Sequence, residues 1–568
     1  MANLIRGFPY RKYNRRFIVL SSSIGLVLLG LILRISYLQI INPNPFIKQG
    51  DMRSIRVEYI PTPRGMIKDR IGRPLAISIP AYSIGIDPKK IDDLNQIIND
   101  DRWKALSAIL AIPINQILER IQSNKNSRFI YLARQVNPTI GENISKLALP
   151  GVYLGQESKR YYPAGKVTAH IVGVTNIDHI GIEGIEKSFD HWLTGKPSKR
   201  IIRKDRLGQV IETISSIAGQ EANQLTLSID IRLQSLVYRE LNHAVILNKA
   251  ESGTAVLIDI DTGEILAMTN SPSYDPNNLN VANNIINNLR NRAVTDSFEP
   301  GSTIKPIVIM AALQCGIVNV NSVINTLPYS VNGYQIKDVV HHNELTLTEI
   351  LKKSSNVGVS KLALSMPLSV LLNTYTLFGI GQKTNLGLTG ESSGFYPQKR
   401  WSKIDRATFS YGYGLMVTPL QLARVYATIG SMGILRPLSI IRVDSPVPGK
   451  RIFSAKLVRT IINMMESISL PGEIGMKAAV TGYRVAIKTG TTKKVGPNGK
   501  YINKYIAYTA GIAPASRPRF ALLIIINDPK AGPYYGGAVS APVFSNIMRN
   551  VLRIMNIEPD AIKSKKIL

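Results

Sequence analysis

Cysteine is nearly absent from this chain of 568 residues, in which Cys315 is the single example. One thiol cannot form an intrachain disulfide, so a domain outside the cytoplasm has to rely on its hydrophobic core. Histidine is scarce as well, and none of the six stands in an HExxH or another paired metal-ligand spacing. We therefore expect neither a disulfide framework nor a metal site.

Motifs for nucleotides and nucleic acids are also missing, because the sequence contains no GxxxxGK[ST] loop, zinc-finger pattern or RNA-binding signature. Acidic residues are in the minority, with 38 Asp and Glu against 69 Lys and Arg, and the formal net charge is +31. A basic surface can attract nucleic acid or anionic membranes. Here the basic residues are scattered rather than massed on one stripe, so we attribute the charge to composition and expect no nucleic-acid partner.

Long hydrophobic runs are lacking except near the N-terminus, where residues 17–33 are all apolar or small and residues 35–41 continue the pattern after Arg34. A spanning helix needs roughly 20 apolar residues, and Arg34 can extend its guanidinium to the membrane surface. No small-residue cleavage site follows, so the sequence predicts an uncleaved single-pass anchor over residues 17–41 rather than a signal peptide. The segment before it is basic, with Arg6, Arg11, Lys12, Arg15 and Arg16.

This basic flank predicts the orientation of the anchor. By the positive-inside rule, the tail of residues 1–16 stays in the cytoplasm and the chain after residue 41 lies on the other side of the membrane. A second apolar stretch at residues 521–527 is far too short to span a membrane and is rich in β-branched residues. It predicts a buried strand.

The remaining sequence changes in texture near residue 225. Residues 42–225 predict a non-catalytic module of short strands and loops, with a turn at residues 71–74 and a hairpin over residues 202–212 around Gly208. From residue 226 to 553 the pattern alternates between strands and amphipathic helices. There we expect an α/β (α+β) domain, an antiparallel sheet flanked by helices, followed by a tail over residues 554–568.

Several elements of this second domain can be placed individually. The turn Asp261-Thr262-Gly263 joins two apolar strands in a predicted hairpin. Helices are predicted near residues 303–315, 346–366, 418–430 and 541–555, and strands near residues 483–491, 505–514 and 519–528.

The first motif with chemical content is S-x-x-K at Ser302 and Lys305, the one example in the sequence. Pro300 and Gly301 precede a predicted helix start, and residues i and i+3 of a helix share a face, so Lys305 Nζ can reach Ser302 Oγ. A serine hydroxyl needs an adjacent base, and a lysine can serve only if burial or nearby cations make it neutral. Alone the motif is weak, because about two or three are expected by chance in such a length.

The second motif is S-x-N at Ser354, Ser355 and Asn356. Taken alone, it is explained more simply as a helix N-cap. Another S-x-N stands at residues 330–332, in a segment that resembles a strand entering a turn.

The third motif is Lys488-Thr489-Gly490-Thr491, at the end of a predicted strand. The glycine lets the backbone approach a substrate closely, while the lysine offers positive charge and the threonines offer hydrogen bonds. The alternative is a strand edge with an ordinary glycine bulge. All three motifs in this order, within one domain, are far more informative than any one of them.

With these motifs in this order, the chain resembles the penicillin-recognising serine transferases, which comprise penicillin-binding proteins and serine β-lactamases. Residues 64–78, 160–165 and 181–190 resemble the boxes of the non-catalytic module in class B penicillin-binding proteins. Residues 409–430 and 534–544 resemble the division-specific septal branch of that class in Gram-negative bacteria, the penicillin-binding protein three type. The resemblance covers nearly the whole chain. It implies an elongated mixed α/β pedestal or dimerisation module before a transpeptidase domain.

The resemblance also implies the catalytic residues. Ser302 would be the acyl-ester nucleophile and Lys305 its general base. Ser354 would relay a proton, and Asn356 would hold the amide of the acyl side chain. Lys488 would supply positive potential.

The resemblance also implies substrate contacts, made by residues of the third motif. Thr489 and Thr491, beside Gly490, would bind the substrate carboxylate, and the backbone N–H groups of Ser302 and Thr491 would form the oxyanion hole. The implied reaction joins peptidoglycan stem peptides at the division septum. Ser302 attacks the penultimate D-alanine carbonyl, the terminal D-alanine leaves, and an amine of a second stem peptide takes the acyl group. β-Lactams enter the same path as inhibitors.

The resemblance implies no metal or organic cofactor. It implies a protein of the inner membrane with a periplasmic catalytic domain, working with a septal glycan polymerase of the SEDS type and other division proteins. The alternatives are an elongation-type transpeptidase, a D,D-carboxypeptidase or β-lactamase, and a β-lactam sensor on the same fold.

Overall fold

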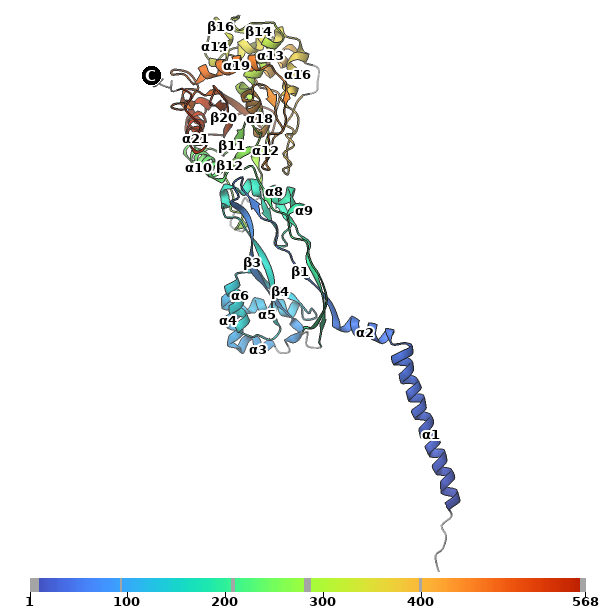
Figure 1. Ribbon diagram of the computed structural model, residues 1–568. Coiled ribbons are helices and arrows are strands. Elements are labelled where there is room, and N and C mark those ends of the chain that lie inside the picture. The colour runs from blue at the N-terminus through green and yellow to red at the C-terminus, as the bar shows by residue number, and fades with distance from the viewer. Residues whose placement is uncertain (1–9, 92–93, 206–209, 280–287, 398–400, 562–568) are drawn as a thin grey trace, which may run out of the picture. The chain divides into compact units, whose positions relative to one another are not determined.

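The computed structural model describes residues 10–91, 94–205, 210–279, 288–397 and 401–561 (Figure 1). Most of the predicted cytoplasmic tail, the end of the C-terminal tail and the hairpin turn around Gly208 therefore lie outside the described residues. The chain divides into two compact units, Met1–Thr62 with Lys196–Glu221, and Pro63–Gly195 with Ala222–Leu568.

The first unit contains the apolar helix predicted as an anchor. Helix α1 (Tyr10–Ser36) continues into a π-helical turn (Tyr37–Ile41), and Asn14–Ile41 is long and apolar enough to cross a membrane, with no part of its apolar window buried. This confirms an apolar helix consistent with a single-pass anchor. Helix α2 (Asn44–Ser54) follows, and an antiparallel sheet of order β1-β8-β9 completes the unit: β1 (Ile55–Ile60), β8 (Ser198–Lys204) and β9 (Val210–Ile217).

Residues 63–195 of the second unit are built around a long strand, β3, which pairs antiparallel with β2, β4 and β5. The strands are β2 (Ile67–Lys68), β3 (Pro74–Ile86), β4 (Ile130–Val136) and β5 (Val152–Tyr161), with β10 (Leu225–Thr226) parallel to β2. Helices α3 (Leu94–Asn99), α4 (Asp101–Leu110), α5 (Ile114–Ser123) and α6 (Pro138–Lys146) lie between β3 and β5 in the chain. Shorter elements follow: α7 (Ala169–Val172), β6 (Val174–Thr175), β7 (Gly181–Glu183), α8 (Gly184–Ser188) and α9 (Asp190–Leu193).

The prediction of short strands and loops is wrong for this part of the chain, since β3 has 13 residues and helices α3 to α6 lie between β3 and β5. These helices are short, so each shows only one or two repeats of the helical pattern. Ile117 and Ile121 of α5, four residues apart, are both buried in the local core with Trp103. That spacing is typical of an amphipathic helix and is the signal in the sequence that indicates α5.

The centre of residues 222–561 is a sheet of order β12-β11-β21-β20-β19 in which every neighbouring pair is antiparallel. Nearly all residues of β11, β12 and β21 are buried, as expected for a sheet covered on both faces. The predicted hairpin and the three C-terminal strands are confirmed. The strands are β11 (Ser252–Asp259), β12 (Ile265–Ser271), β19 (Ala486–Val495), β20 (Tyr501–Ala513) and β21 (Phe520–Asn527).

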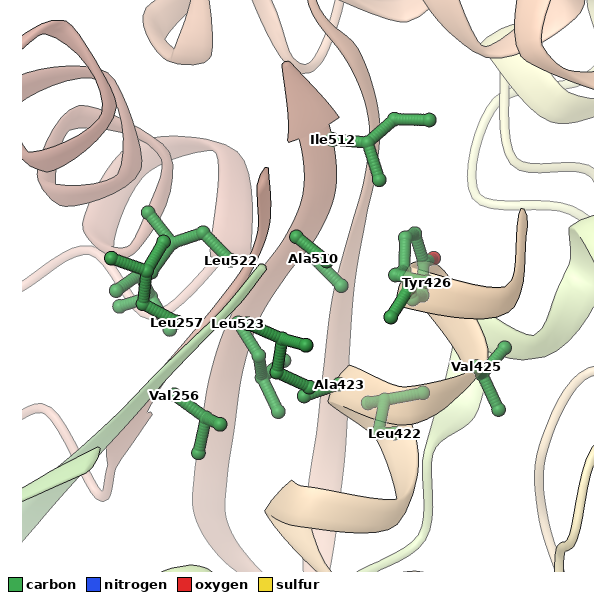
Figure 2. Packing of buried hydrophobic residues seen from close by; sticks show 14 of the residues in the cluster. Val256, Leu257, Leu422, Ala423, Val425, Tyr426, Ala510, Ile512, Leu522 and Leu523 are labelled. Carbon is green, nitrogen blue, oxygen red and sulfur yellow. The ribbon is translucent and has the colours of Figure 1, made fainter. Parts of the chain in front are cut away.

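Helix α18 (Pro419–Gly430) covers one face of this sheet, while α10 (Ile231–Leu247) and α21 (Ala541–Ile554) pack on the other. Figure 2 shows Ala423 of α18 beside Ala510 and Leu523. Leu522, which precedes Leu523 on β21, and its partner Leu257 on β11 point away from α18. The alternation is that of a pleated strand buried on both sides. Full burial of such a leucine stabilises the fold by about 1.5–3 kcal/mol.

The first two motifs lie on helical elements outside the sheet. A 3₁₀ turn (Gly301–Ile304) leads into α13 (Lys305–Gln314), which packs against α15, α16 and α19. The helix predicted at residues 346–366 is two helices, because the chain takes a left-handed conformation at Ser354. The other helices of this part of the chain are α12 (Arg292–Thr295), α14 (Leu347–Lys352), α15 (Asn356–Ser365), α16 (Leu368–Leu377), α17 (Lys403–Ser410), α19 (Ala455–Glu466) and α20 (Gly536–Val539). The other strands form two-stranded pairs: β13 (Val323–Asn325) with β16 (Glu344–Thr346), β14 (Tyr329–Val331) with β15 (Tyr334–Ile336), and β17 (Ile434–Leu435) with β18 (Lys450–Arg451).

Candidate active site

Ser302 lies in the 3₁₀ turn directly before α13 and is partly exposed. The turn depends on Gly301, whose φ is +52° and where a Cβ atom would lie 2.4 Å from Tyr508 Oη. Neither the backbone angle nor the space suits a side chain there. Gly301 N also donates a hydrogen bond to Gly412 O at 3.1 Å. The close packing of residue 301 holds the serine at the surface of a buried cluster.

Lys305 is fully buried at the first residue of α13. Its Nζ donates to Ser354 O, to Asn356 Oδ1 at 2.7 Å and, more weakly, to Ser354 Oγ at 3.3 Å. In the described part of the chain, no hydrogen bond joins Lys305 to Ser302. A buried amine must satisfy its donors, and here the acceptors of the second motif do so. The first and second motifs are therefore brought together through the lysine.

Lys488 of β19 is also fully buried and reaches the same serine. Its Nζ donates to Ser354 Oγ at 3.0 Å and to Thr489 O at 3.1 Å. Ser354 Oγ thus lies between Lys305 Nζ and Lys488 Nζ. One hydroxyl group links all three motifs.

The surroundings lower the pKa of both lysines. Burial lowers the pKa of Lys305 well below its usual value, the charge of Lys488 lowers it further, and the carboxylate of Asp338 acts in the opposite direction. Burial lowers the pKa of Lys488 to about 7. A lowered pKa favours the neutral form of a lysine, and only the neutral form can act as a general base.

The two serines of the second motif face in different directions. Ser355 is the N-cap of α15, and its Oγ accepts a hydrogen bond from Gly358 N at 2.8 Å. Ser354 has a φ of +58°, a conformation that costs a residue with a side chain about 1–2 kcal/mol, and it faces the lysines. The helix-cap interpretation therefore applies to Ser355. In the competing S-x-N, Asn332 instead forms the β14–β15 turn and accepts from Ile404 N.

The third motif lies on β19, the edge strand of the central sheet, where alternate backbone groups have no partner strand. At Gly490 a Cβ atom would lie 2.0 Å from Tyr508 Cε2, so only glycine fits. Thr491 Oγ1 accepts from Gly536 N at 2.9 Å and retains its own hydrogen for a ligand. Thr489, two residues away on the same strand face, is largely buried.

Two carboxylates beside these motifs carry no signal in the sequence. Glu299, three residues before Ser302, is 8% exposed and accepts from Gly414 N at 2.8 Å and from Tyr501 Oη at 3.1 Å. Burial raises the pKa of Glu299. Asp338 lies at the N-terminus of α15. Asp338 comes next to the second motif only through the fold, and Glu299, although close to Ser302 in the chain, finds its hydrogen-bond partners only through the fold. No spacing in the sequence therefore indicates either contact.

Comparison with known proteins gives a consistent result over nearly the whole chain. The penicillin binding protein transpeptidase domain matches residues 253–549, and the penicillin-binding protein dimerisation domain matches residues 59–227. Peptidoglycan D,D-transpeptidase FtsI of Escherichia coli (strain K12) is 64% identical over 548 residues, which are 96% of this chain and 93% of that protein. FtsI of Buchnera aphidicola subsp. Schizaphis graminum (strain Sg) is 58% identical over 553 residues, 97% of each. The crystal structure of a peptidoglycan synthetase from Bifidobacterium adolescentis ATCC 15703 matches with a TM-score of 0.71 and 26% identity, covering 90% of this chain and 98% of that one.

Proposed function

The chain belongs to the penicillin-binding proteins that combine a dimerisation domain with a transpeptidase domain, and we propose that it cross-links peptidoglycan at the division septum through an acyl-enzyme on Ser302. Its activity is that of a peptidoglycan D,D-transpeptidase, the activity named for its 64% identical relative. The observation that carries the assignment of residues is the buried pair Lys305 and Lys488 around Ser354 Oγ, with the partly exposed Ser302 three residues before Lys305. We set the non-catalytic module at residues 42–225 and the catalytic domain at residues 226–553.

Acylation begins with proton removal from Ser302. Neutral Lys305 takes the proton as Ser302 Oγ attacks the penultimate D-alanine carbonyl of a stem pentapeptide. The negative charge that develops on the carbonyl oxygen is held by the N–H groups of Ser302 and Thr491. The tetrahedral intermediate then collapses to an ester on Ser302, and the C–N bond to the terminal D-alanine breaks.

The departing amine needs a proton, and Ser354 is placed to deliver it. Its hydroxyl can donate one proton while it accepts another from Lys488 Nζ, 3.0 Å away. In the second half-reaction the amine of another stem peptide attacks the ester carbonyl, the bond between the acyl carbon and Ser302 Oγ breaks, and the same groups return the protons, one of them to Ser302 Oγ. Asn356 orients the acyl side chain, and Thr489 and Thr491 donate hydrogen bonds to the substrate carboxylate.

The edge position of β19 supports an extended peptide as the substrate. Free backbone groups of an edge strand pair with an added strand, which gives affinity through the main chain and specificity through side-chain pockets. A D,D-carboxypeptidase or a β-lactamase would use the same acyl-enzyme with water as acceptor. A sensor would stop at the ester. The near full-length likeness to D,D-transpeptidases favours an amine as the acceptor.

The septal site of action is supported by the likeness to FtsI relatives over nearly the full chain. Depletion of the protein in a rod-shaped host is expected to give filaments that elongate without dividing, because septal cross-links are no longer made. The measurement is cell length and shape by microscopy, with a host that carries a second, functional copy as the control. Round cells would instead identify an elongation-type enzyme and leave the chemistry of Ser302 untouched.

Cross-linking needs nascent glycan close to Ser302. We propose a septal glycan polymerase of the SEDS type as partner, together with other division proteins, held through the anchor and the non-catalytic module. A tethered partner raises the effective concentration of the glycan strand near the active site.

We place the N-terminus in the cytoplasm and the chain after residue 41 in the periplasm of an inner-membrane protein. Arg15 and Arg16 at the start of the apolar helix support this orientation. Lys48→Cys, at an exposed position of α2, should react with a membrane-impermeant thiol reagent in cells with a permeabilised outer membrane. A Cys315→Ala background removes the native thiol and serves alone as the control. Lack of reaction at residue 48 until the cells are lysed would contradict the topology.

A further inference from the structure

Asp338 lies in the loop after β15, 17 residues before Ser355, and its carboxylate contacts three consecutive residues from Ser355 onward. One oxygen accepts from Ser355 Oγ. The other accepts from Asn356 N and from Val357 N, the latter at 2.9 Å. The first N–H groups of a helix have no partner within the helix, and a carboxylate is favoured at this end. Asp338 thus caps α15 from a different part of the chain.

Asp338 contacts Asn356, which presents one acceptor of Lys305, and Ser355, which directly follows Ser354, the residue that presents the other two. Lys305 Nζ donates to Ser354 O, Ser354 Oγ and Asn356 Oδ1, and to no other acceptor in the described part of the chain. Ser354 has the unfavourable φ of +58°, which persists only if the surroundings fix it. The next two residues are fixed by Asp338. A shift at Ser355 or Asn356 would therefore move every group that orients the lysine.

We propose that Asp338 is a positioning residue for acyl transfer, which holds Ser354 and Asn356 against Lys305 by clamping the start of α15. This inference rests on the proposed function, because it assigns Asp338 a part in the acylation of Ser302. Asp338 acts through the second motif and does not itself touch the reacting atoms.

The charge of Asp338 gives this role a signature in the pH profile. The charged groups that act on Lys305 are Lys488, which lowers its pKa, and Asp338, which raises it. Replacing the carboxylate by an amide of the same shape removes the raising influence. The pKa of Lys305 should fall further, so the acid limb of the acylation profile should move to lower pH.

Two substitutions separate the charge from the clamp. Asp338→Asn retains one oxygen for the two backbone N–H groups, and it should lower the limiting acylation rate about tenfold. Asp338→Ala leaves both N–H groups without an acceptor. It should lower the limiting rate about 100-fold, as expected for misplaced catalytic groups. Ser355→Ala removes the hydroxyl donor from the clamp. Combined with Asp338→Asn, it should cost less than the product of the two single effects, because both changes act on one contact network.

The experiment measures acylation of the full chain in detergent by fluorescent penicillin, over a concentration series at each pH, with thermal unfolding of each variant in parallel. The limiting rate should fall with the half-saturating concentration little changed, and the Asp338→Asn profile should shift to lower pH. The matched control is Asp100→Asn, which alters a helix-capping carboxylate of α4 in the non-catalytic module.

The outcomes separate this inference from the proposed function. If the wild-type chain does not acylate, the proposed function fails and the inference fails with it. If it acylates and Asp338→Asn matches it in rate and pH profile, the inference alone is overturned. It is also overturned if the loss in Asp338→Ala vanishes once the rate is expressed per folded molecule, because a purely structural role would give that result.

Discussion

Lys305→Arg is expected to slow the acylation of Ser302 by roughly 10²-fold or more, as severely as Lys305→Ala. Arginine keeps the positive charge, but its guanidinium does not lose a proton in a protein. If Lys305 served only as a cation, arginine would replace it in part. Because we assign it the role of a neutral base, charge alone cannot rescue the reaction. The measurement is the rate of fluorescent penicillin acylation.

The same series tests the protonation state of Lys305. The wild-type acylation rate should rise with pH as Lys305 loses its proton. This acid limb of the pH profile should lie well below the usual lysine pKa of 10.5, because burial and the charge of Lys488 lower the pKa of Lys305. The Arg variant should show no such limb. Lys456→Arg, at an exposed position on α19, is the matched control. Acylation close to wild type in the Lys305→Arg variant would show that charge, and not proton transfer, is the role of this residue.

The motifs of the proposed site can be located from the sequence, because each is a short run of defined residue types. Ser302, Lys305 and Lys488 are recognisable by residue type, spacing and order. The strands of the central sheet are recognisable too, since runs such as residues 521–527 are apolar and β-branched and lie between turn residues.

The rest depends on long-range contacts that no local pattern encodes. The motif does not say which serine faces the lysines, because this is decided by the left-handed φ of Ser354 and by the cap that Ser355 forms. Asp338 and Glu299 have no spacing rule, since each finds its partners through the tertiary fold. The depressed pKa of Lys305 likewise follows from burial that only the packed domain provides.

Ser302→Ala is expected to abolish both reactions of the enzyme, since no other nucleophile is proposed for the acyl group. The variant should release no D-alanine from a stem pentapeptide and should take up no penicillin. The wild-type chain should release D-alanine and, with an amine acceptor present, form the cross-linked product. Ser330→Ala, which changes the exposed serine of the competing S-x-N, should leave both reactions intact. Hydrolysis without cross-linking by the wild type would identify a carboxypeptidase, and acylation without turnover would identify a sensor.

The most direct test of the account is to locate the covalent adduct. The full chain is labelled with fluorescent penicillin and digested, and the modified peptide is sequenced by mass spectrometry. We expect one adduct, on Ser302, in the peptide that contains Lys305, and none in the Ser302→Ala variant. Labelling that persists in this variant, or an adduct on another residue of the wild-type chain, would contradict this expectation.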